Sequence, residues 1–209
     1  MIDVIILAAG TSQRFGSDKL LEIVEGKKLL TMTISAFENT KEIKKFIIVG
    51  NKNNQDWILD FIKEKGYTFV LGGETRSESV SKGLEKVESD FVLIHDGARP
   101  FVSTTLIKNI STEIMTKDLD CVVPVLKVTN CLKNINGKVT TVDRDDFVMS
   151  QTPQAFKTVS IKKEFENFDK NWFDDCQALE GKSYKIQTIQ GDLKNIKITY
   201  KDDIINLAR

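Results

Sequence analysis

Residues 2–19 read IDVIILAAGTSQRFGSDK, and this stretch decides the fold. Its first six residues are apolar except for one aspartate, a composition typical of a buried strand. The chain then changes to Ala8, Ala9 and Gly10, whose small side chains let a ligand lie against the peptide N–H groups. Arg14 and Lys19 follow and could neutralise a polyphosphate there. From these residues alone, a phosphate-binding loop and an ordinary tight turn both remain open.

Apolar strands and amphipathic helices alternate after this opening. Strands are predicted at 46–49, 67–71, 91–94, 120–125 and 184–189. Helices are predicted at 28–40, 55–65, 75–87, 103–116, 160–168, 174–180 and 201–207. The alternation favours a Rossmann-like α/β fold, in which helices cover both faces of a mostly parallel open sheet. We expect a single domain over residues 1–209.

Residues 126–146 interrupt the alternation. Polar and β-branched residues surround Asn136-Gly137, a dipeptide that strongly indicates the turn of a two-stranded hairpin. A protruding β-arm of this size buries too little surface to be rigid alone. We therefore expect the arm to pack on a second copy of the chain in a homodimer.

Charge and hydropathy exclude several classes of partner. Thirty basic residues balance thirty acidic ones, so we expect neither nucleic acid nor a membrane surface to bind. Apolar runs stay well below the roughly 18 residues that span a bilayer. Asp3 makes the first strand a poor signal peptide, and the expected location is the cytoplasm. Three separated cysteines and one histidine predict neither a disulfide framework nor a zinc site.

Two further loops carry residues that suit a nucleotide. Gly72-Gly73 is followed by Arg76 and Ser79, and the strand at 91–94 leads into a loop that contains Asp96 and Arg99. The carboxyl ends of parallel strands share one edge of a sheet, so we expect these loops to converge with the first. The loops lack the G-K-[ST] ending of a P-loop and the G-x-G-x-x-G of dinucleotide dehydrogenases.

Asp96 is the first candidate for a metal ligand. An aspartate at a strand end, beside a phosphate loop, suits Mg²⁺, which one or two carboxylates and phosphate oxygens usually hold. Helix capping or pairing with Arg99 is the alternative role. We interpret the neighbouring His95 as a hydrogen-bonded strand-end residue, not as a catalytic base.

The motifs, taken in order, resemble one family over nearly the whole chain. They are LAAG-x-x-x-R at 7–14, GG-x-x-R-x-x-SV at 72–80, HDGARPF at 95–101, VDR at 142–144, QTPQAF at 151–156, D-D-x₄-E at 174–180 and NIKIT at 195–199. They are similar to those of 2-C-methyl-D-erythritol 4-phosphate cytidylyltransferases. The resemblance implies a GT-A-like nucleotidyltransferase of isoprenoid precursor biosynthesis by the non-mevalonate pathway. Its substrates would be CTP and that sugar-alcohol phosphate, and it would use Mg²⁺ and release pyrophosphate.

The resemblance also implies roles for individual residues. The catalytic group is Arg14, Lys19, Asp96 and Lys197; the nucleotide-binding group is Ala8, Ala9, Gly10, Gly72, Gly73, Arg76 and Ser79; the substrate-binding group is Arg99, Arg144 and Thr152; and the metal ligands are Asp96 and Asp192. In the family, residues matching Arg144 and Thr152 reach the neighbouring subunit's site. A surface salt bridge with Asp145 or Asp146 is the alternative role of Arg144.

Several positions depart from the family pattern. Cys131 and Phe173 stand where threonines are usual, and Lys194 replaces an acid, which leaves Asp192 as the nearest carboxylate. That spacing is closer to ribitol-phosphate cytidylyltransferases, so another alcohol phosphate is the first alternative. A nucleotide-binding module without catalysis is the second. The short loop between Arg14 and Lys19 is similar to that of molybdenum-cofactor nucleotidyltransferases, which are a weaker alternative, and an NAD-linked dehydrogenase is a remote one.

Overall fold

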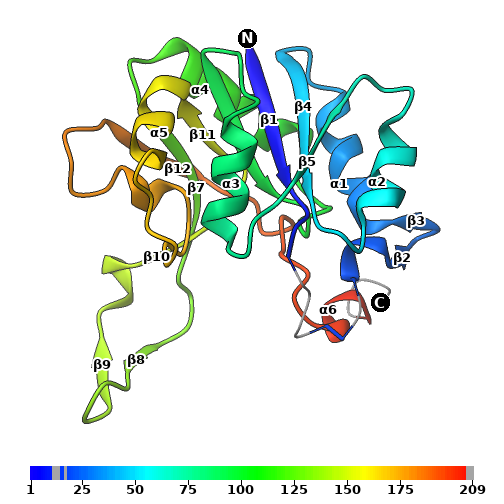
Figure 1. Ribbon diagram of the computed structural model, residues 1–209. Coiled ribbons are helices and arrows are strands. Elements are labelled where there is room, and N and C mark those ends of the chain that lie inside the picture. The colour runs from blue at the N-terminus through cyan, green and yellow to red at the C-terminus, as the bar shows by residue number, and fades with distance from the viewer. Residues whose placement is uncertain (11–14, 17, 206–209) are drawn as a thin grey trace.

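An eight-stranded sheet forms the centre of the molecule (Figure 1). The computed structural model describes residues 1–10, 15–16 and 18–205. The strands of the sheet are β1 (Ile2–Leu7), β4 (Ile43–Gly50), β5 (Thr68–Leu71), β6 (Phe91–Asp96), β7 (Cys121–Lys127), β10 (Val148–Ser150), β11 (Gln154–Lys157) and β12 (Ile186–Gln190). Two of them, β10 and β11, lie in a stretch where the sequence predicted no strand.

Parallel pairing dominates the sheet, as predicted. β1 pairs in parallel with both β4 and β6, β5 extends the sheet beyond β4, and β12 pairs in parallel with β7. The unpredicted β11 runs antiparallel between β6 and β7, with Ala155 opposite Leu93 on one side and Val122 on the other. β11 was missed because it is only four residues long and begins one residue after a proline.

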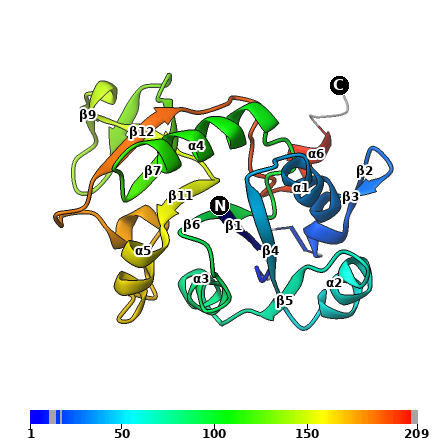
Figure 2. The same cartoon turned by 90° about the horizontal axis from the view of Figure 1, so that it is seen from above.

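Helices cover both faces of the sheet, as predicted (Figure 2). They are α1 (Leu29–Glu38), α2 (Gln55–Ile62), α3 (Arg76–Leu84), α4 (Thr104–Thr116), α5 (Thr158–Phe165) and α6 (Lys201–Ile205). Alternate side chains of a strand point to opposite faces. In β1, Val4 and Ile6 therefore belong to the apolar cluster that holds α1, α2 and α4, whereas Ile5 belongs to the cluster that holds α3 and α5.

The prediction of an α-helix at 174–180 is wrong. Only a short 3₁₀ turn, η3 (Cys176–Ala178), forms there. Side chains take the backbone donors that an α-helix would leave at its start: Gln154 Oε1 accepts from Cys176 N–H at 3.0 Å, and Asp174 Oδ1 accepts from Gln177 N–H at 3.1 Å. These bonds fix the start of the segment to β11, and a single 3₁₀ turn follows.

The predicted arm is present and projects away from the sheet (Figure 1). β8 (Leu132–Asn134) and β9 (Thr140–Val142) pair antiparallel, and Gly137 in the turn has a φ of +87°, which glycine adopts without strain. A 3₁₀ turn, η2 (Arg144–Asp146), connects the arm to β10.

A second, smaller hairpin was not predicted. β2 (Ile23–Val24) and β3 (Lys27–Lys28) follow the 3₁₀ turn η1 (Lys19–Leu21) and lead into α1. Across the described ranges, helices are too short or too polar to cross a bilayer.

Candidate active site

The carboxyl ends of β1 and β6 open onto a cavity of about 600 Å³. Its walls are Leu7, Ala9, Gly10, Lys19, Leu20, Asn51, Gly73, Glu74, Thr75, Arg76, Ser79, Asp96, Ala98, Lys197 and Thr199. The structure thus brings together the three loops that the sequence predicted would converge. Arg14 lies outside the described residues.

Two asparagines that the sequence analysis missed hold the first loop. Asn54 is fully buried, and its Nδ2 donates to the carbonyl of Ala8 at 2.9 Å and to Asp18 Oδ2 at 3.0 Å. Asn51 Nδ2 donates to the carbonyl of Ala9 at 3.3 Å. Both asparagines follow β4, so the neighbouring strand fixes the two ends of the loop. Ala8 itself is buried and, contrary to its predicted role in nucleotide binding, is not among the residues that line the cavity.

The diglycine turn packs directly against the first loop. A Cβ atom on Gly72 would lie 2.5 Å from the Cβ of Ala9 and 2.8 Å from Ser79 Oγ. Ser79 Oγ also accepts from Gly73 N–H at 3.1 Å and donates to the carbonyl of Thr75 at 3.0 Å. Gly72 is therefore required by close approach of the two loops, and the Ser79 hydroxyl orders the turn.

We expect Gly72→Ala to separate the two loops and to lower the free energy of unfolding by about 1–3 kcal/mol, the usual cost of overpacking. Chemical denaturation measures this change. Gly10→Ala is the matched control, because a Cβ on Gly10 would have no neighbour within 4 Å among the residues that the structure describes. An equal denaturation midpoint for the two variants would contradict the expectation.

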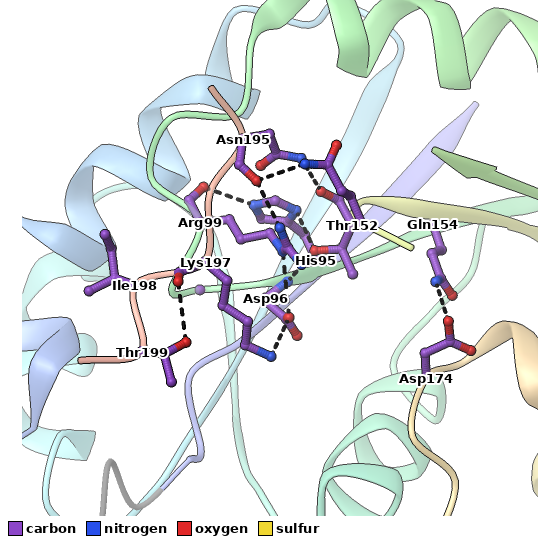
Figure 3. Close-up of polar contacts among 12 residues, drawn as sticks. His95, Asp96, Arg99, Thr152, Gln154, Asp174, Asn195, Lys197, Ile198 and Thr199 are labelled. Carbon is purple, nitrogen blue, oxygen red and sulfur yellow. Dashed lines mark hydrogen bonds and ion pairs between the residues drawn. The ribbon is translucent and has the colours of Figure 1, made fainter. Parts of the chain in front are cut away.

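Asp96 is the electrostatic centre of the cavity (Figure 3). Its carboxylate lies 2.8 Å from Lys197 Nζ, 3.4 Å from Arg76 and 3.8 Å from Arg99 Nε. Burial acts to raise the pKa of Asp96, but the cations Arg76, Lys197 and Arg99 outweigh it and hold that pKa well below its usual value. The group therefore remains a carboxylate at neutral pH.

Lys19 reaches the same region from the first loop. Its Nζ donates to the carbonyl of Ile198 at 2.7 Å, next in the chain to Lys197. Two lysines from opposite ends of the sequence thus line one cavity. This is the arrangement expected of cations that act on one polyanionic ligand.

Arg76 is held by a second carboxylate, that of Asp175, to which the sequence analysis gave no role of its own. Its NH1 and NH2 groups donate to the two oxygens of Asp175 at 2.7 and 2.8 Å. Asp175 is only 1% exposed. Although burial acts to lower the pKa of Arg76, Asp175 and Asp96 raise it, so the guanidinium stays charged.

His95 is a hydrogen-bonded strand-end residue, as the sequence indicated. It is fully buried; its Nε2 lies 3.2 Å from the carbonyl of Arg99, and its Nδ1 lies 3.1 Å from Thr152 Oγ1. Thr152 Oγ1 accepts from Asp96 N–H at 3.0 Å, so Nδ1 accepts from this hydroxyl and Nε2 donates. Burial lowers the pKa of His95 to about 4, which keeps the ring neutral.

Among the described residues, six that were predicted to belong to the site do not line this cavity: Ala8, Gly72, Arg99, Arg144, Thr152 and Asp192. Thr152 is buried, Arg144 lies on the arm and donates to the carbonyl of Thr129 at 2.6 Å, and the Asp192 carboxylate accepts from Lys194 N–H at 2.8 Å. Arg99 lies at the edge of the site, where it donates to the carbonyl of Asn195 at 2.7 Å. The sequence analysis gave Asn195 no role, but its carbonyl holds the side chain of Arg99.

The fold and the cavity together define a class of protein. The sheet is mostly parallel, and its carboxyl edge carries two small-residue loops and several cations around one ionised aspartate. This combination is typical of an enzyme that acts on nucleotide phosphates. Residues 2–208 match the family model of 2-C-methyl-D-erythritol 4-phosphate cytidylyltransferase. The chain belongs to this family of nucleotidyltransferases.

Individual relatives agree with the family model. The chain is 35% identical to a 2-C-methyl-D-erythritol 4-phosphate cytidylyltransferase of Dictyoglomus thermophilum, over 96% of this chain and 92% of the relative. A crystal structure of 4-diphosphocytidyl-2C-methyl-D-erythritol synthase from Anaerococcus prevotii is 32% identical with a TM-score of 0.87, over 100% and 96% of the two chains. The bifunctional IspDF of Campylobacter jejuni is 30% identical with a TM-score of 0.86, over 97% of this chain and 53% of that one.

Proposed function

We propose that the chain transfers the cytidylyl group of CTP to 2-C-methyl-D-erythritol 4-phosphate and releases pyrophosphate. The observation that carries this proposal is the gathering of Lys19, Lys197 and Asp96 around the cavity that the first loop and the diglycine turn enclose. The proposal includes the cytoplasmic location expected from the sequence, which cell fractionation tests.

The reaction requires positioning and charge neutralisation more than proton transfer. A phosphate monoester is already anionic at neutral pH, so one of its oxygens can attack the α-phosphorus of CTP without a general base. A new phosphorus–oxygen bond forms there, and the bond from the α-phosphorus to the bridging oxygen breaks as pyrophosphate leaves. We assign Lys19 and Lys197 to neutralise the charge that gathers on the reacting phosphates. His95 is therefore not needed as a general base.

Asp96 fits the expected Mg²⁺. It is an ionised carboxylate on the cavity wall, and Mg²⁺ is usually held by one or two carboxylates together with substrate phosphates. The described residues contain no cluster of three or more metal-ligating side chains, so triphosphate oxygens would supply most other ligands. Bound there, Mg²⁺ would neutralise phosphate charge. Asp192 stays a prediction as a ligand, and its carboxylate is engaged by the Lys194 backbone.

A substrate matrix tests the proposed function. The purified chain, with Mg²⁺, is given each of the four nucleoside triphosphates together with 2-C-methyl-D-erythritol 4-phosphate or ribitol 5-phosphate, and pyrophosphate release is measured. We expect turnover with CTP and the methylerythritol phosphate. Turnover with ribitol 5-phosphate alone would assign another alcohol phosphate, and nucleotide binding without turnover would identify an inactive module.

We also propose that the arm joins two copies of the chain. Large apolar side chains are exposed along the arm and the strand that follows it, including Ile135, Val139 and Val148. Clustered apolar groups of this kind favour burial against a partner. Arg144, on the same arm, would then reach the substrate phosphate in the partner's site, where a guanidinium can make two parallel hydrogen bonds.

Mixing two inactive variants tests the shared site. Arg144→Ala and Lys197→Ala are each expected to be inactive as homodimers. Random exchange of subunits should restore about a quarter of the wild-type activity, because half of the dimers are mixed and each mixed dimer has one intact site. Sedimentation checks that both variants dimerise. A mixture that stays inactive despite confirmed exchange would place Arg144 in its own subunit's site, and an active Arg144→Ala homodimer would place it outside any site.

A further inference from the structure

We infer that Asp175 is a positioning residue for the reaction: through Arg76 it holds the Asp96 carboxylate in its working position. This inference rests on the proposed function of the cavity. The resemblance to the family implies that Arg76 binds the nucleotide. In the structure, however, the guanidinium of Arg76 faces two carboxylates of its own chain.

The contacts of Arg76 form a bridge between these carboxylates. NH1 and NH2 donate to the two oxygens of Asp175 at 2.7 and 2.8 Å, the parallel geometry in which guanidinium–carboxylate pairs are strongest. Nε and NH2 donate to Asp96 Oδ1, both at 3.4 Å. The shorter and better aligned pair is the one with Asp175. Asp175 therefore decides where the guanidinium lies, and Asp96 receives the weaker contact.

Asp175 is fixed by the central sheet. It directly precedes η3, whose Cys176 N–H donates to Gln154 Oε1 at 3.0 Å. Gln154 Nε2 donates to Asp174 Oδ2 at 3.0 Å, as Figure 3 shows. Gln154 is fully buried on β11 and pairs with Ile94, two residues before Asp96. The Asp175–Arg76 pair thus ties the start of α3 to the strand that carries Asp96.

The charges around Asp96 explain what this restraint achieves. Lys197 Nζ lies 2.8 Å from Asp96 Oδ2, whereas Arg76 approaches only the other oxygen, Oδ1. Without Asp175, the partly buried guanidinium would have Asp96 as its remaining partner and would move towards it. That movement would displace the carboxylate from Lys197 and from the cavity. Asp175 therefore keeps Arg76 and Lys197 on separate oxygens of Asp96.

Steady-state kinetics test this role. Asp175→Asn and Arg76→Lys each remove the two-pronged pair, and we expect each to lower kcat about a hundredfold with the KM for CTP nearly unchanged, as misplacement of reacting groups does. A direct nucleotide contact predicts the opposite: Arg76→Lys would raise the KM for CTP, and Asp175→Asn would leave both constants unchanged. That pattern would overturn the inference.

Matched variants separate positioning from folding. Asp118→Asn also breaks an aspartate ion pair, with Lys185, but the pair is exposed and lies just before the amino ends of β7 and β12, so kcat should stay at the wild-type value. The double variant Arg76→Met with Asp175→Leu replaces both partners of the pair by apolar groups, which preserves folding more often than a single change does. Thermal unfolding checks that it is folded.

Together with the single variants Arg76→Met and Asp175→Leu, the double variant also gives a thermodynamic cycle. If the two residues act as one unit, its kcat should equal that of either single variant, because the losses of coupled groups do not add. A folded double variant with wild-type kcat, or with the product of the two single losses, would overturn the inference. Wild-type turnover is measured first. Its absence would refute the proposed function, whereas wild-type turnover with unaffected variants would refute only the role of Asp175.

Discussion

Replacing Lys197 with alanine is expected to lower kcat about a thousandfold and to leave the fold intact, because it removes a preorganised cation from the site of developing phosphate charge. Lys197 Nζ lies 2.8 Å from Asp96, and its side chain is 41% exposed. Asp96 retains Arg76 and Arg99 in the variant, so no buried carboxylate is left without a partner. Pyrophosphate release at saturating CTP measures kcat, and thermal unfolding checks the fold.

Lys117→Ala is the control for this experiment. Lys117 also pairs with a carboxylate, that of Glu113, and its side chain is 50% exposed, so the chemical change and the exposure are matched. The pair lies at the end of α4, outside the residues that line the cavity. We expect wild-type kcat from this variant. Equal kcat values for Lys197→Ala and Lys117→Ala would refute the proposed role of Lys197.

Replacing Asp96 with asparagine is the second large effect that we expect. The change keeps the shape of the side chain but removes the charge that faces Arg76, Arg99 and Lys197. It also removes the carboxylate that we assign to Mg²⁺. We expect kcat to fall about a thousandfold and the Mg²⁺ concentration for half-maximal activity to rise. Arg99 is largely buried, so the free energy of unfolding should also fall, by about 2 kcal/mol.

A magnesium titration separates the two effects of Asp96→Asn. If the carboxylate only balanced the neighbouring cations, the activity of the variant would be lower than that of the wild type by the same factor at every Mg²⁺ concentration. If it holds the metal, added Mg²⁺ should recover part of the lost activity. Asp118→Asn, whose ion pair is exposed, controls for the aspartate-to-asparagine change itself. A magnesium dependence equal to that of the wild type would exclude Asp96 as a ligand.

Local sequence patterns were sufficient for the main architecture. The alternation of apolar strands and amphipathic helices predicted the parallel part of the sheet, because each pattern reflects the side-chain period of its own element. The order of the strands then predicted that the loops after β1, β5 and β6 would meet at one edge. Thr75 and Ser103, the first residues of the helices predicted at 75–87 and 103–116, are the N-caps of α3 and α4 in the structure.

The structure corrected the sequence analysis where distant segments compete with local preference. β11 is a strand because Ala155 and Phe156 complete the sheet between β6 and β7, an environment that four residues of sequence do not reveal. The segment after Phe173 forms a 3₁₀ turn whose first backbone N–H, that of Cys176, is held by Gln154, 22 residues away.

By itself the sequence determined the class of fold, the edge of the sheet that carries the site, and the family, since these depend on patterns that are local or ordered along the chain. Only the tertiary structure decided which side chains hold that site in place. Asn54 under the first loop and Asp175 behind Arg76 are ordinary polar residues in the sequence. Their roles arise from burial beside partners that are distant along the chain, where an ion pair or hydrogen bond fixes a position that no local pattern records.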